Sequence, residues 1–425
     1  MEYTRAEEAK LKKRLSEPVR FINILAGPRQ VGKTTIIRDL IPPESSHGYY
    51  ISVDEEVEVS ISAIDSTTST ISPPQKKDAA WLRYYWREAR NRAGKWSEIC
   101  LRNDTSTQNQ PYIFAIDEIQ KIDQWSDVVK GLWDEDRSND LYMHVVLLGS
   151  APLLIQKGLT ESLAGRYELM TITHWSFTEM QQAFDFSFEE YIYFGGYPGS
   201  ATLIHEEARW RSYVRESLIQ PNIEKDIVQM VRIKNPALLK QLFELGCHYS
   251  GQELSLTKMI AELKEARHTV TLADYLQLLT QAKLLAGLHK YAAKELRKRN
   301  SVPKLIVFNT ALMSSIQDYT FAEAQADRSY WGRLVESAVG AHLLNSCDND
   351  TQVHYWRDGS DEVDFVLTRG RKLTAIEVKS SPNPRRVRGL GVFSERNPTA
   401  KTILVGAGGI PLAEFLSHST DHWLD

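Results

Sequence analysis

The chain has 425 residues, of which 42% are hydrophobic and 25% charged, a composition typical of a globular protein with about two to four domains. Its formal net charge of −4 at pH 7 excludes a strongly basic chain, so any surface for nucleic acid would have to be local. Cys100, Cys247 and Cys347 are far apart and form no CxxC pair, which argues against a zinc knuckle or a disulfide framework.

Export and membrane signals are not evident in the sequence. The opening MEYTRAEEAKLKKRL is charged throughout and has no apolar core of the kind that a secretion signal needs. Because no run of about 18 apolar residues occurs, we expect no membrane-spanning helix and no membrane partner. These features predict a cytoplasmic protein.

The first part of the chain alternates helical and strand-like patterns. We expect helices at 5–16, 34–40 and 81–92, and strands at 21–27, 49–54, 112–118 and 143–150. The strands are continuous apolar runs, typical of a parallel sheet that is covered on both faces, and their alternation with helices predicts an α/β fold. Residues 60–78 are polar and rich in turn formers, which indicates a surface segment.

This alternation ends near residue 180. Residues 188–227 have a mostly helical pattern that breaks at FGGYPG (194–199), and residues 236–287 contain several short helical patterns. A basic, hairpin-like stretch follows at 284–309. The last segment begins with a helix at 331–344 and continues as the strands HYWRD, EVDFVLT, KLTAIEVKS and KTILVG. We therefore expect domain boundaries near residues 180, 230 and 310.

GPRQVGKT, residues 27–34, matches the phosphate-loop pattern G-x-x-x-x-G-K-[ST] in full and lies between a predicted strand and a predicted helix. Glycines let backbone N–H groups close around phosphates, and the helix adds its positive N-terminal end. Lys33 would reach the β- and γ-phosphates, and the Thr34 hydroxyl would bind Mg²⁺. The expected nucleotide-binding residues are Gly27, Pro28, Arg29, Gln30, Val31, Gly32, Lys33, Thr34 and Thr35.

Two further strands end in residues that suit nucleotide hydrolysis. IFAIDEIQ carries a strand out to Asp117, which would support Mg²⁺, and to Glu118, which would orient and deprotonate the attacking water. LLGS places Ser150 at the end of another strand, where it would either sense the γ-phosphate or be a plain loop serine.

The motifs GPRQVGKTT, FAIDEIQ, VVLLGSAPLL and LAGRYELMTITHWSFTEM resemble the AAA-type ATPases, and closely resemble one bacterial and archaeal branch with a C-terminal domain of unknown function. The resemblance continues through FGGYPG, GRLVES, EVDFV and IEVKS and so covers nearly the whole chain. It implies ATP and Mg²⁺ as cofactors, and a homo-oligomer in which an arginine from a neighbouring subunit completes the site. Arg166 in LAGR is the candidate, and a surface arginine after a helix is the alternative. The segment 55–110 is longer and more polar than the resemblance leads us to expect.

Residues 254–291 have a layout that resembles a winged helix-turn-helix, which docks its second helix against DNA. A short helix (Thr257–Glu265), a polar turn with His268 and a second helix (Leu272–Ala282) precede a strand-like wing. The second helix is poor in Arg and Lys, and the basic charge lies in the wing, at Lys290, Lys294, Arg297, Lys298 and Arg299. A wing that grips phosphates and a structural module with a solvated basic turn both stay open.

Glu336, Asp364, Glu377 and Lys379 form a second candidate site. Glu377 and Lys379 lie two residues apart on a predicted strand and therefore share a face. If the EVDFVL and AIEVKS strands are neighbours, Asp364 joins them, and Glu336 on the preceding helix completes a set of oxygen ligands for Mg²⁺ or Mn²⁺. Lys379 would activate a water or stabilise phosphate charge.

The order Glu…Asp…Glu-x-Lys on helix, strand and strand resembles the PD-(D/E)XK nuclease superfamily. The resemblance implies metal-dependent cleavage of nucleic acid, with Glu336, Asp364 and Glu377 on the metal and Asp364, Glu377 and Lys379 in the catalytic step. A decayed nuclease fold that is kept for assembly or for binding is the alternative. Basic residues that could line a nucleic-acid path are Arg357, Arg371, Lys372, Arg385, Arg386 and Arg388.

The predicted fold class is α/β, with a P-loop AAA-type ATPase domain (1–180), a helical lid (181–230), a winged-helix-like module (231–310) and a C-terminal restriction-endonuclease-like α/β domain (311–425). The predicted function is Mg²⁺-dependent ATP binding and hydrolysis coupled to DNA binding or processing. The alternative is a nucleotide-switched interaction or assembly protein whose nuclease-like domain is inert.

Overall fold

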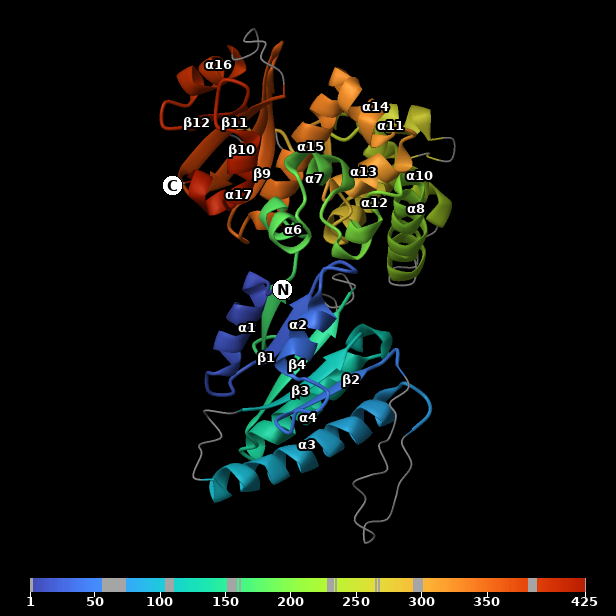
Figure 1. The fold of residues 1–425 in the computed structure, drawn as a ribbon, viewed down its shortest axis with the longest axis vertical. Helices are drawn as coiled ribbons and strands as arrows, with labels where there is room; N and C mark the ends of the chain where they lie inside the picture. Colours follow the sequence, from blue (N-terminus) through green and yellow to red (C-terminus); the bar gives the residue numbers. More distant parts are fainter. Residues whose placement is uncertain are drawn as a thin grey trace. The chain divides into compact units, whose positions relative to one another are not determined.

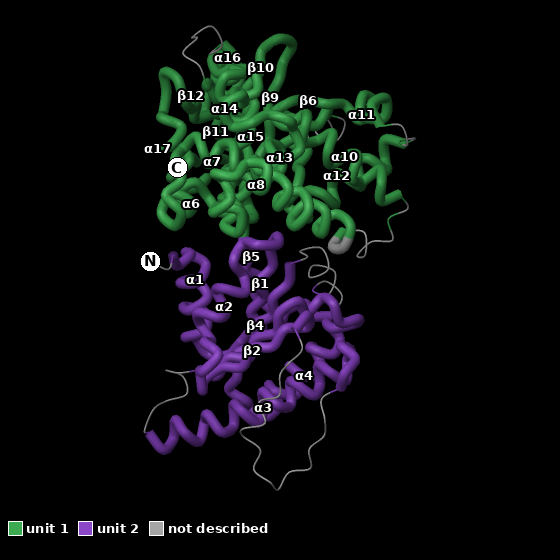
Figure 2. The backbone as a smooth tube through the Cα atoms, turned by 45° about the vertical axis from the view of Figure 1, so that its right-hand side comes forward, with its two compact units in different colours: residues 1–2, 173–425 green, residues 3–172 purple. Residues whose placement is uncertain are grey.

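The computed structural model describes residues 3–55, 74–103, 111–150, 159, 162–227, 233, 235–263, 266, 268–292, 301–380 and 388–424. They form two compact units, an N-terminal unit that spans Tyr3–Ile172 (purple in Figure 2) and a C-terminal unit that begins at Thr173 (green in Figure 2). A search of the described helices finds none that is long and apolar enough to span a bilayer.

The N-terminal unit is built on a sheet of five parallel strands in the order β2-β3-β4-β1-β5 (Figure 1). The strands are β1 (Ile22–Ala26), β2 (Gly48–Ser52), β3 (Tyr112–Asp117), β4 (Met143–Gly149) and β5 (Tyr167–Thr171). The helices are α1 (Ala6–Leu15), α2 (Lys33–Leu40), α3 (Ala79–Arg102), η2 (Ile119–Lys121) and α4 (Trp125–Ser138). The predicted α/β fold with a parallel sheet is confirmed.

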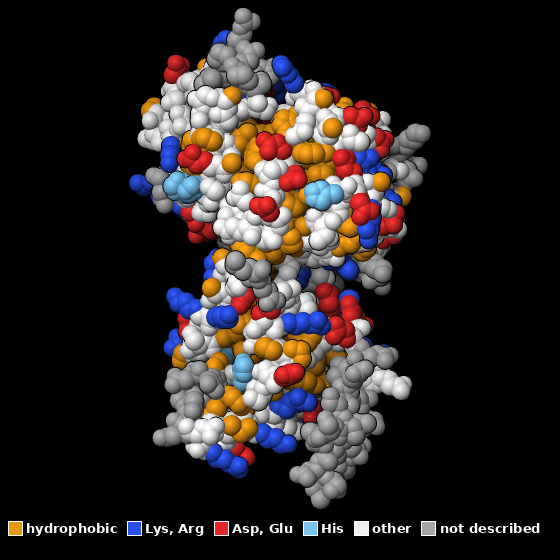
Figure 3. Space-filling view, viewed as in Figure 1, with side chains coloured by type: hydrophobic (Ala, Val, Ile, Leu, Met, Phe, Trp, Pro, Cys, Tyr) orange, Lys and Arg blue, Asp and Glu red, His pale blue; other side chains and the backbone are white. Residues whose placement is uncertain are grey.

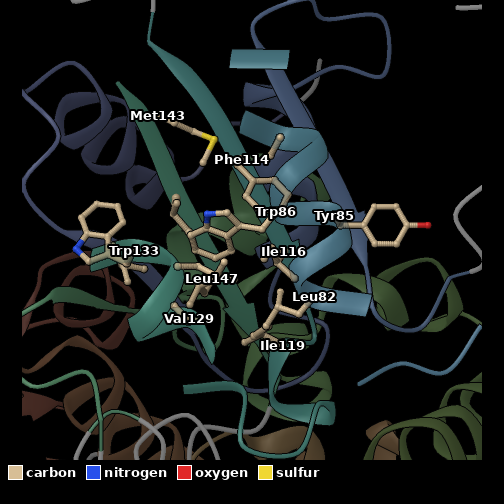
Figure 4. Close-up of a cluster of buried hydrophobic side chains, with 14 of the residues drawn as sticks. Leu82, Tyr85, Trp86, Phe114, Ile116, Ile119, Val129, Trp133, Met143 and Leu147 are labelled. Atoms are coloured by element: carbon tan, nitrogen blue, oxygen red, sulfur yellow. The ribbon is translucent and has the colours of Figure 1, made fainter. Parts of the chain in front are cut away.

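Side chains alternate between the two faces of this sheet, so it separates two hydrophobic cores. Phe114 and Leu147 lie in the core that α3 and α4 cover, where the indole of Trp86 meets the Phe114 ring edge-on with centroids 5.5 Å apart (Figure 4). Ala115 and Leu148, one position further along, lie in the core that α1 and α2 cover. Burial on both faces explains why these strands are continuous apolar runs.

Helix α3 is the main feature of the segment between β2 and β3. It runs for 24 residues, twice the expected length, and begins at an N-cap, Asp78, whose carboxylate accepts the backbone N–H groups of Ala80 and Trp81. Its buried side chains include Trp81, Trp86 and Trp96. Most of the polar stretch expected at 60–78 lies outside the described residues, as do residues 104–110.

The C-terminal unit begins with helices and then contains two sheets. Its helices are α6 (Phe177–Phe184), α7 (Phe188–Phe194), η3 (Pro198–Leu203), α8 (Glu207–Tyr213), η4 (Val214–Ile219), η5 (Asn222–Ile227), α10 (Pro236–His248), α11 (Leu256–Glu262), α12 (Thr269–Gln281), α13 (Thr310–Ile316), α14 (Phe321–Ala326), α15 (Arg328–Ser346), α16 (Arg388–Arg396), α17 (Leu412–Ser417) and α18 (Thr420–Leu424). Helix α7 ends where FGGYPG begins. A Cβ on Gly195, whose φ is 70°, would lie 2.0 Å from Asn309 Oδ1, so only glycine fits there.

The smaller sheet is antiparallel, in the order β6-β8-β7, with β6 (Gln252–Glu253), β7 (Leu285–Leu288) and β8 (Lys304–Val307). Strands β7 and β8 form the expected hairpin-like pair, and residues 293–300 between them lie outside the described part of the chain. Together with α10, α11 and α12, this sheet follows the order helix, strand, helix, helix, strand, strand.

The larger sheet has four strands in the order β12-β11-β10-β9, namely β9 (Gln352–Asp358), β10 (Asp361–Arg369), β11 (Lys372–Lys379) and β12 (Lys401–Gly406). β9, β10 and β11 are successively antiparallel, and β12 joins β11 in parallel through the crossover helix α16. The helix and four strands expected from the sequence are all present. The boundaries that we expect near 230 and 310 fall within one compact unit and stay predictions.

Candidate nucleotide site and C-terminal carboxylate cluster

The loop between β1 and α2 has the backbone shape that a phosphate cradle needs. Gln30 and Gly32 have left-handed φ angles of 58° and 92°, the conformation found in loops whose N–H groups bind anions. Gly27 is required by close packing, since a Cβ there would lie 2.0 Å from the carbonyl oxygen of Ile172. The guanidinium of Arg5 donates to the Val31 carbonyl at 2.8 Å and ties the N-terminal segment to the loop.

Lys33 is the first residue of α2, and its side chain folds back over the loop. Its ammonium donates to the carbonyls of Gly27 at 2.9 Å and Pro28 at 2.6 Å. The residue is only 6% exposed, so the loop itself holds this charge in place. Thr35, next along α2, is exposed.

Thr34 and Asp117, which the sequence predicts as Mg²⁺ ligands, lie side by side. The Thr34 hydroxyl donates to Asp117 Oδ2 at 2.7 Å, although 83 positions separate them in the chain. The Tyr50 hydroxyl donates to the same Oδ2 at 2.9 Å, and the Glu118 N–H donates to Oδ1 at 2.9 Å. A hydroxyl beside a buried carboxylate is a donor set that fits Mg²⁺, a hard cation that takes one or two carboxylates besides phosphate oxygens.

Tyr50 is a residue of this site that sequence reasoning missed. It lies on β2, whose register pairs Ser52 with Asp117 on β3, so its ring reaches along the strand to the carboxylate. Burial and the neighbouring Asp117 raise the pKa of Tyr50, which keeps the phenol protonated as a hydrogen-bond donor. Its only signal in the sequence was its place near the end of an apolar strand.

Glu118 has a backbone conformation that residues other than glycine seldom adopt, and two neighbouring side chains bind its carboxylate. Its φ of 55° and ψ of 36° are left-handed, a strain found often at functional sites. Glu118 Oε2 accepts the Ser150 hydroxyl at 2.9 Å and the Gln120 amide at 2.5 Å. Because β4 lies between β1 and β3, Ser150 at the carboxyl end of β4 reaches the Glu118 carboxylate. Gln120 was not predicted.

Arg166 does not join this group within one chain. It directly precedes β5, and its carbonyl accepts the Ile22 N–H at the start of β1, so it lies at the amino ends of strands whose carboxyl ends carry the phosphate loop. A strand of this length separates those edges by about 15 Å. Its guanidinium donates to both oxygens of Asp134 on α4, at 2.8 and 3.0 Å, and this hydrogen bonding lowers the pKa of Asp134.

The carboxylates of the C-terminal unit lie on neighbouring elements, as the spacing predicts. Strands β10 and β11 pair directly, and the Val378 N–H donates to Asp364 Oδ2 at 2.8 Å. The Lys379 ammonium pairs with Glu377 on the same face of β11. Burial raises the pKa of Glu377, and the nearby Asp364 raises it further while Lys379 lowers it.

Lys304, at the start of β8, enters this cluster and was not predicted. Its Nζ lies 2.5 Å from Glu336 Oε1 and 3.5 Å from Asp364 Oδ1. Burial by itself would lower the pKa of Lys304, but Glu336 and Asp364 outweigh it and raise that pKa, so the ammonium stays charged. Burial raises the pKa of Glu336, which Lys304 opposes.

The described residues therefore do not form the expected second metal site. Within the described ranges, no group of three or more His, Cys, Asp and Glu side chains is arranged to hold a metal ion. Glu336, Asp364 and Glu377 instead share two lysines and a backbone N–H as partners. The physical reason is that Lys304 comes from a separate sheet, which the spacing of the motif does not include.

The basic residues expected to line a nucleic-acid path are dispersed. Arg357 pairs with Glu253 and Glu362, and Arg388 pairs with Asp361. Arg371 and Lys372 lie at the β10–β11 turn, at the opposite end of both strands from Asp364 and Glu377. Arg385 and Arg386, and the wing residues Lys294, Arg297, Lys298 and Arg299, lie outside the described residues. On the face shown in Figure 3, acidic and basic side chains are interspersed over both units.

Comparison with known protein families agrees with the geometry of the N-terminal unit. Residues 19–181 match the family model of an AAA domain. This part of the chain is therefore similar to AAA domains, which supports a P-loop ATPase. Residues 185–322 match one domain of unknown function, DUF8612, and residues 331–413 match another, DUF4143. Neither of these two matches assigns the chain a DNA-binding or nuclease domain.

Some known proteins are similar to this chain over longer stretches, at low sequence identity. Uncharacterized proteins of Mycobacterium tuberculosis and Mycobacterium bovis are each 26% identical over 281 residues, which cover 64% of this chain and 59% of each relative. The match thus spans less than two thirds of their length. A solved Walker-type ATPase of Pyrococcus abyssi is similar over 74% of this chain and 96% of its own, with a TM-score of 0.44 and 13% identity.

Proposed function

We propose that this protein binds ATP with Mg²⁺ and hydrolyses it in the N-terminal unit. The observation that carries the proposal is the convergence of three chain segments. Thr34 from the phosphate loop contacts Asp117 from the end of β3, and Ser150 from the end of β4 contacts Glu118. Backbone N–H groups, a lysine, a metal-binding pair and a general base are the parts that phosphoryl transfer to water requires.

Each residue has a role that follows from its contacts. Lys33 would exchange the carbonyls of Gly27 and Pro28 for phosphate oxygens, since it already lies over the loop. Thr34 and Asp117 would hold Mg²⁺, which supplies charge neutralisation at the phosphates when it is bound. Glu118 would take the proton of the attacking water, with its carboxylate oriented by Ser150.

Lys33→Ala and Glu118→Gln test this proposal. We expect both variants to lose phosphate release, while only Lys33→Ala loses binding of a fluorescent ATP analogue. General-base catalysis contributes about 10²–10⁴-fold, so Glu118→Gln should lower kcat by that factor. Glu98→Gln, which changes an exposed carboxylate on α3, is the matched control. Phosphate release by Glu118→Gln at the wild-type rate would contradict the role of Glu118 as the general base.

For Arg166, we propose action in trans in a homo-oligomer, because its place at the amino ends of the strands keeps it from the site of its own chain. A mixing experiment tests this. Lys33→Ala and Arg166→Ala chains are each expected to be inactive alone, and an equimolar mixture should recover activity at interfaces that pair an intact loop with an intact arginine. A mixture as inactive as its components would contradict the proposal.

We propose two alternatives for the process that ATP hydrolysis drives. In the first, the C-terminal unit binds or cuts DNA. The order of α10 to β8 supports it, since it is that of a winged helix, as does the placement of Glu336, Asp364, Glu377 and Lys379 on helix, strand and strand. In the second, ATP switches an interaction or assembly protein whose nuclease-like domain is inert. The contact of Lys304 with Glu336 and Asp364 favours the second form.

The two forms differ in what happens to DNA. Wild type and Asp364→Ala/Glu377→Ala would be incubated with linear, branched and single-stranded DNA, with Mg²⁺ or Mn²⁺, in the presence and absence of ATP. Cleavage by wild type that the double variant loses would establish the first form. ATP hydrolysis with intact DNA under every condition would support the second.

A further inference from the structure

Lys304 is a buried cation that the nucleotide site does not use. It opens β8, the run KLIV, in which all four residues are buried. A lysine is rarely buried to this degree unless an anion compensates its charge. Here the anions come from the neighbouring part of the same unit, Glu336 on α15 and Asp364 on β10. Its ammonium also donates to the main-chain oxygen of Asp364 at 3.2 Å.

Several carboxylate oxygens of the cluster already face a donor, whereas Glu377 Oε2 is buried without a hydrogen-bond partner among the described residues. Asp364 Oδ2 accepts the Val378 N–H at 2.8 Å, and its Oδ1 lies 3.5 Å from Lys304. Glu377 pairs with Lys379. A divalent ion needs about six oxygen ligands, and here two ammonium groups already share three carboxylates. A metal among them would also be repelled by Lys304 at short range. These residues therefore do not fit a divalent ion.

We propose that the Lys304 ammonium is the resident cation of this cluster and takes the place that a divalent metal would have among Glu336, Asp364 and Glu377. Lys304 and Lys379 offset two of the three carboxylate charges, so the C-terminal sheet binds β8 of the smaller sheet instead of Mg²⁺ or Mn²⁺. The cluster then acts as an internal joint between the smaller sheet and the larger sheet. This proposal is independent of ATP hydrolysis in the N-terminal unit.

Other contacts join the same two sheets close by. The Tyr291 N–H donates to the Tyr355 carbonyl at 2.6 Å, and the Tyr355 hydroxyl donates to the Val302 carbonyl at 2.5 Å. Lys290 forms an isolated parallel bridge with Tyr355 on β9. The ion pairs of Lys304 with α15 and β10 are thus accompanied by hydrogen bonds between β9 and residues that flank β7 and β8, as a structural joint requires.

Manganese binding to the full-length protein tests the proposal. Mn²⁺ would be titrated without nucleotide and followed by the electron paramagnetic resonance signal of the free ion. Asp364→Asn alone, with Lys304 intact, should bind Mn²⁺ as wild type does. Lys304→Met, which keeps the length of the side chain and removes its charge, should gain one Mn²⁺ site at least about ten-fold tighter than any in wild type. Lys304→Met/Asp364→Asn should lose that site.

Lys258→Met, which changes an exposed lysine on α11, is the matched control and should behave as wild type. Two results would overturn the proposal. One is Mn²⁺ binding by wild type that Asp364→Asn abolishes, because the metal would then displace Lys304. The other is a Lys304→Met protein that gains no site, because Lys304 would then not be what excludes the metal.

Removal of a buried charge can prevent folding, so refolding provides a second readout. If Lys304→Met does not fold in metal-free buffer, it would be refolded from urea with Mn²⁺ or with K⁺. Circular dichroism would measure the recovery of folded protein. Recovery with Mn²⁺ but not with K⁺ supports the exchange of one cation for another. Failure to recover with either ion overturns it.

Discussion

Replacing Tyr50 with phenylalanine removes a single hydroxyl from the nucleotide site. In the native chain this hydroxyl donates to Asp117 Oδ2 at 2.9 Å, the oxygen that also accepts the Thr34 hydroxyl at 2.7 Å. The ring itself stays, since phenylalanine keeps its shape and its contact with the guanidinium of Arg38, 5.4 Å from the ring centre. The perturbation is therefore confined to one hydrogen bond to a carboxylate that we assign to Mg²⁺.

The size of the effect follows from the partners that remain. A hydrogen bond to a charged group contributes about 1.5–3 kcal/mol. Asp117 keeps the Glu118 N–H on Oδ1, which limits its rotation, so the lower end of this range applies. A loss of about 1.4 kcal/mol corresponds to a ten-fold effect. We expect Tyr50→Phe to need about ten-fold more Mg²⁺ for half-maximal ATP hydrolysis.

The assay is phosphate release at saturating ATP over a series of Mg²⁺ concentrations. Tyr49→Phe is the matched control, because Tyr49 is the adjacent residue of β2 and points to the opposite face, where it stacks on Phe114 and lies under Arg92. It loses the same hydroxyl without touching Asp117. Equal Mg²⁺ requirements in the two variants would refute the assignment of Asp117 and Tyr50 to the metal site.

Two further predictions concern the C-terminal unit. Gly389→Ala should lower the free energy of unfolding by about 2 kcal/mol, because its Cβ would lie 1.9 Å from the carbonyl oxygen of Glu362, whereas Gly391→Ala on the same helix has open space and should raise it by up to about 1 kcal/mol; urea denaturation measures both, and equal effects would contradict the packing argument. Burial lowers the pKa of His342 from 6.5 to about 4, so between these pH values the unfolded chain binds a proton that the folded chain does not. Stability from this group is complete above pH 6.5 and is lost as the pH falls toward about 4, by up to about 3 kcal/mol. The advantage of wild type over His342→Gln should therefore shrink between pH 7 and pH 4, and a difference that is independent of pH would contradict the assignment.

The nucleotide site could be predicted because its parts are contiguous in the sequence. GPRQVGKT is one loop, and the strand that ends at Asp117 and Glu118 is one apolar run. In a parallel sheet the carboxyl ends of all strands meet at one edge, so naming the strands is enough to bring Thr34 and Asp117 together. The role of Arg166 in a neighbouring subunit stays a prediction, and the structure adds that Arg166 lies at the amino ends of the strands, away from the site of its own chain.

The sequence by itself determined the parallel α/β domain, its phosphate loop and the placement of Glu377 and Lys379 on one face of a strand. Each of these depends on local periodicity or on a short motif. Tertiary structure alone decided which side chains complete these sites. Tyr50 lies in no motif, and Gln120 ends the motif IFAIDEIQ without an assigned role there. Their contacts depend on the register of β2 and on the turn after β3. Lys304 is the clearest case, because a lysine at the start of a buried strand only indicates that an anion must lie nearby. That the anions are Glu336 and Asp364, the expected metal ligands, is set by the packing of one sheet against another, which no spacing in the sequence encodes.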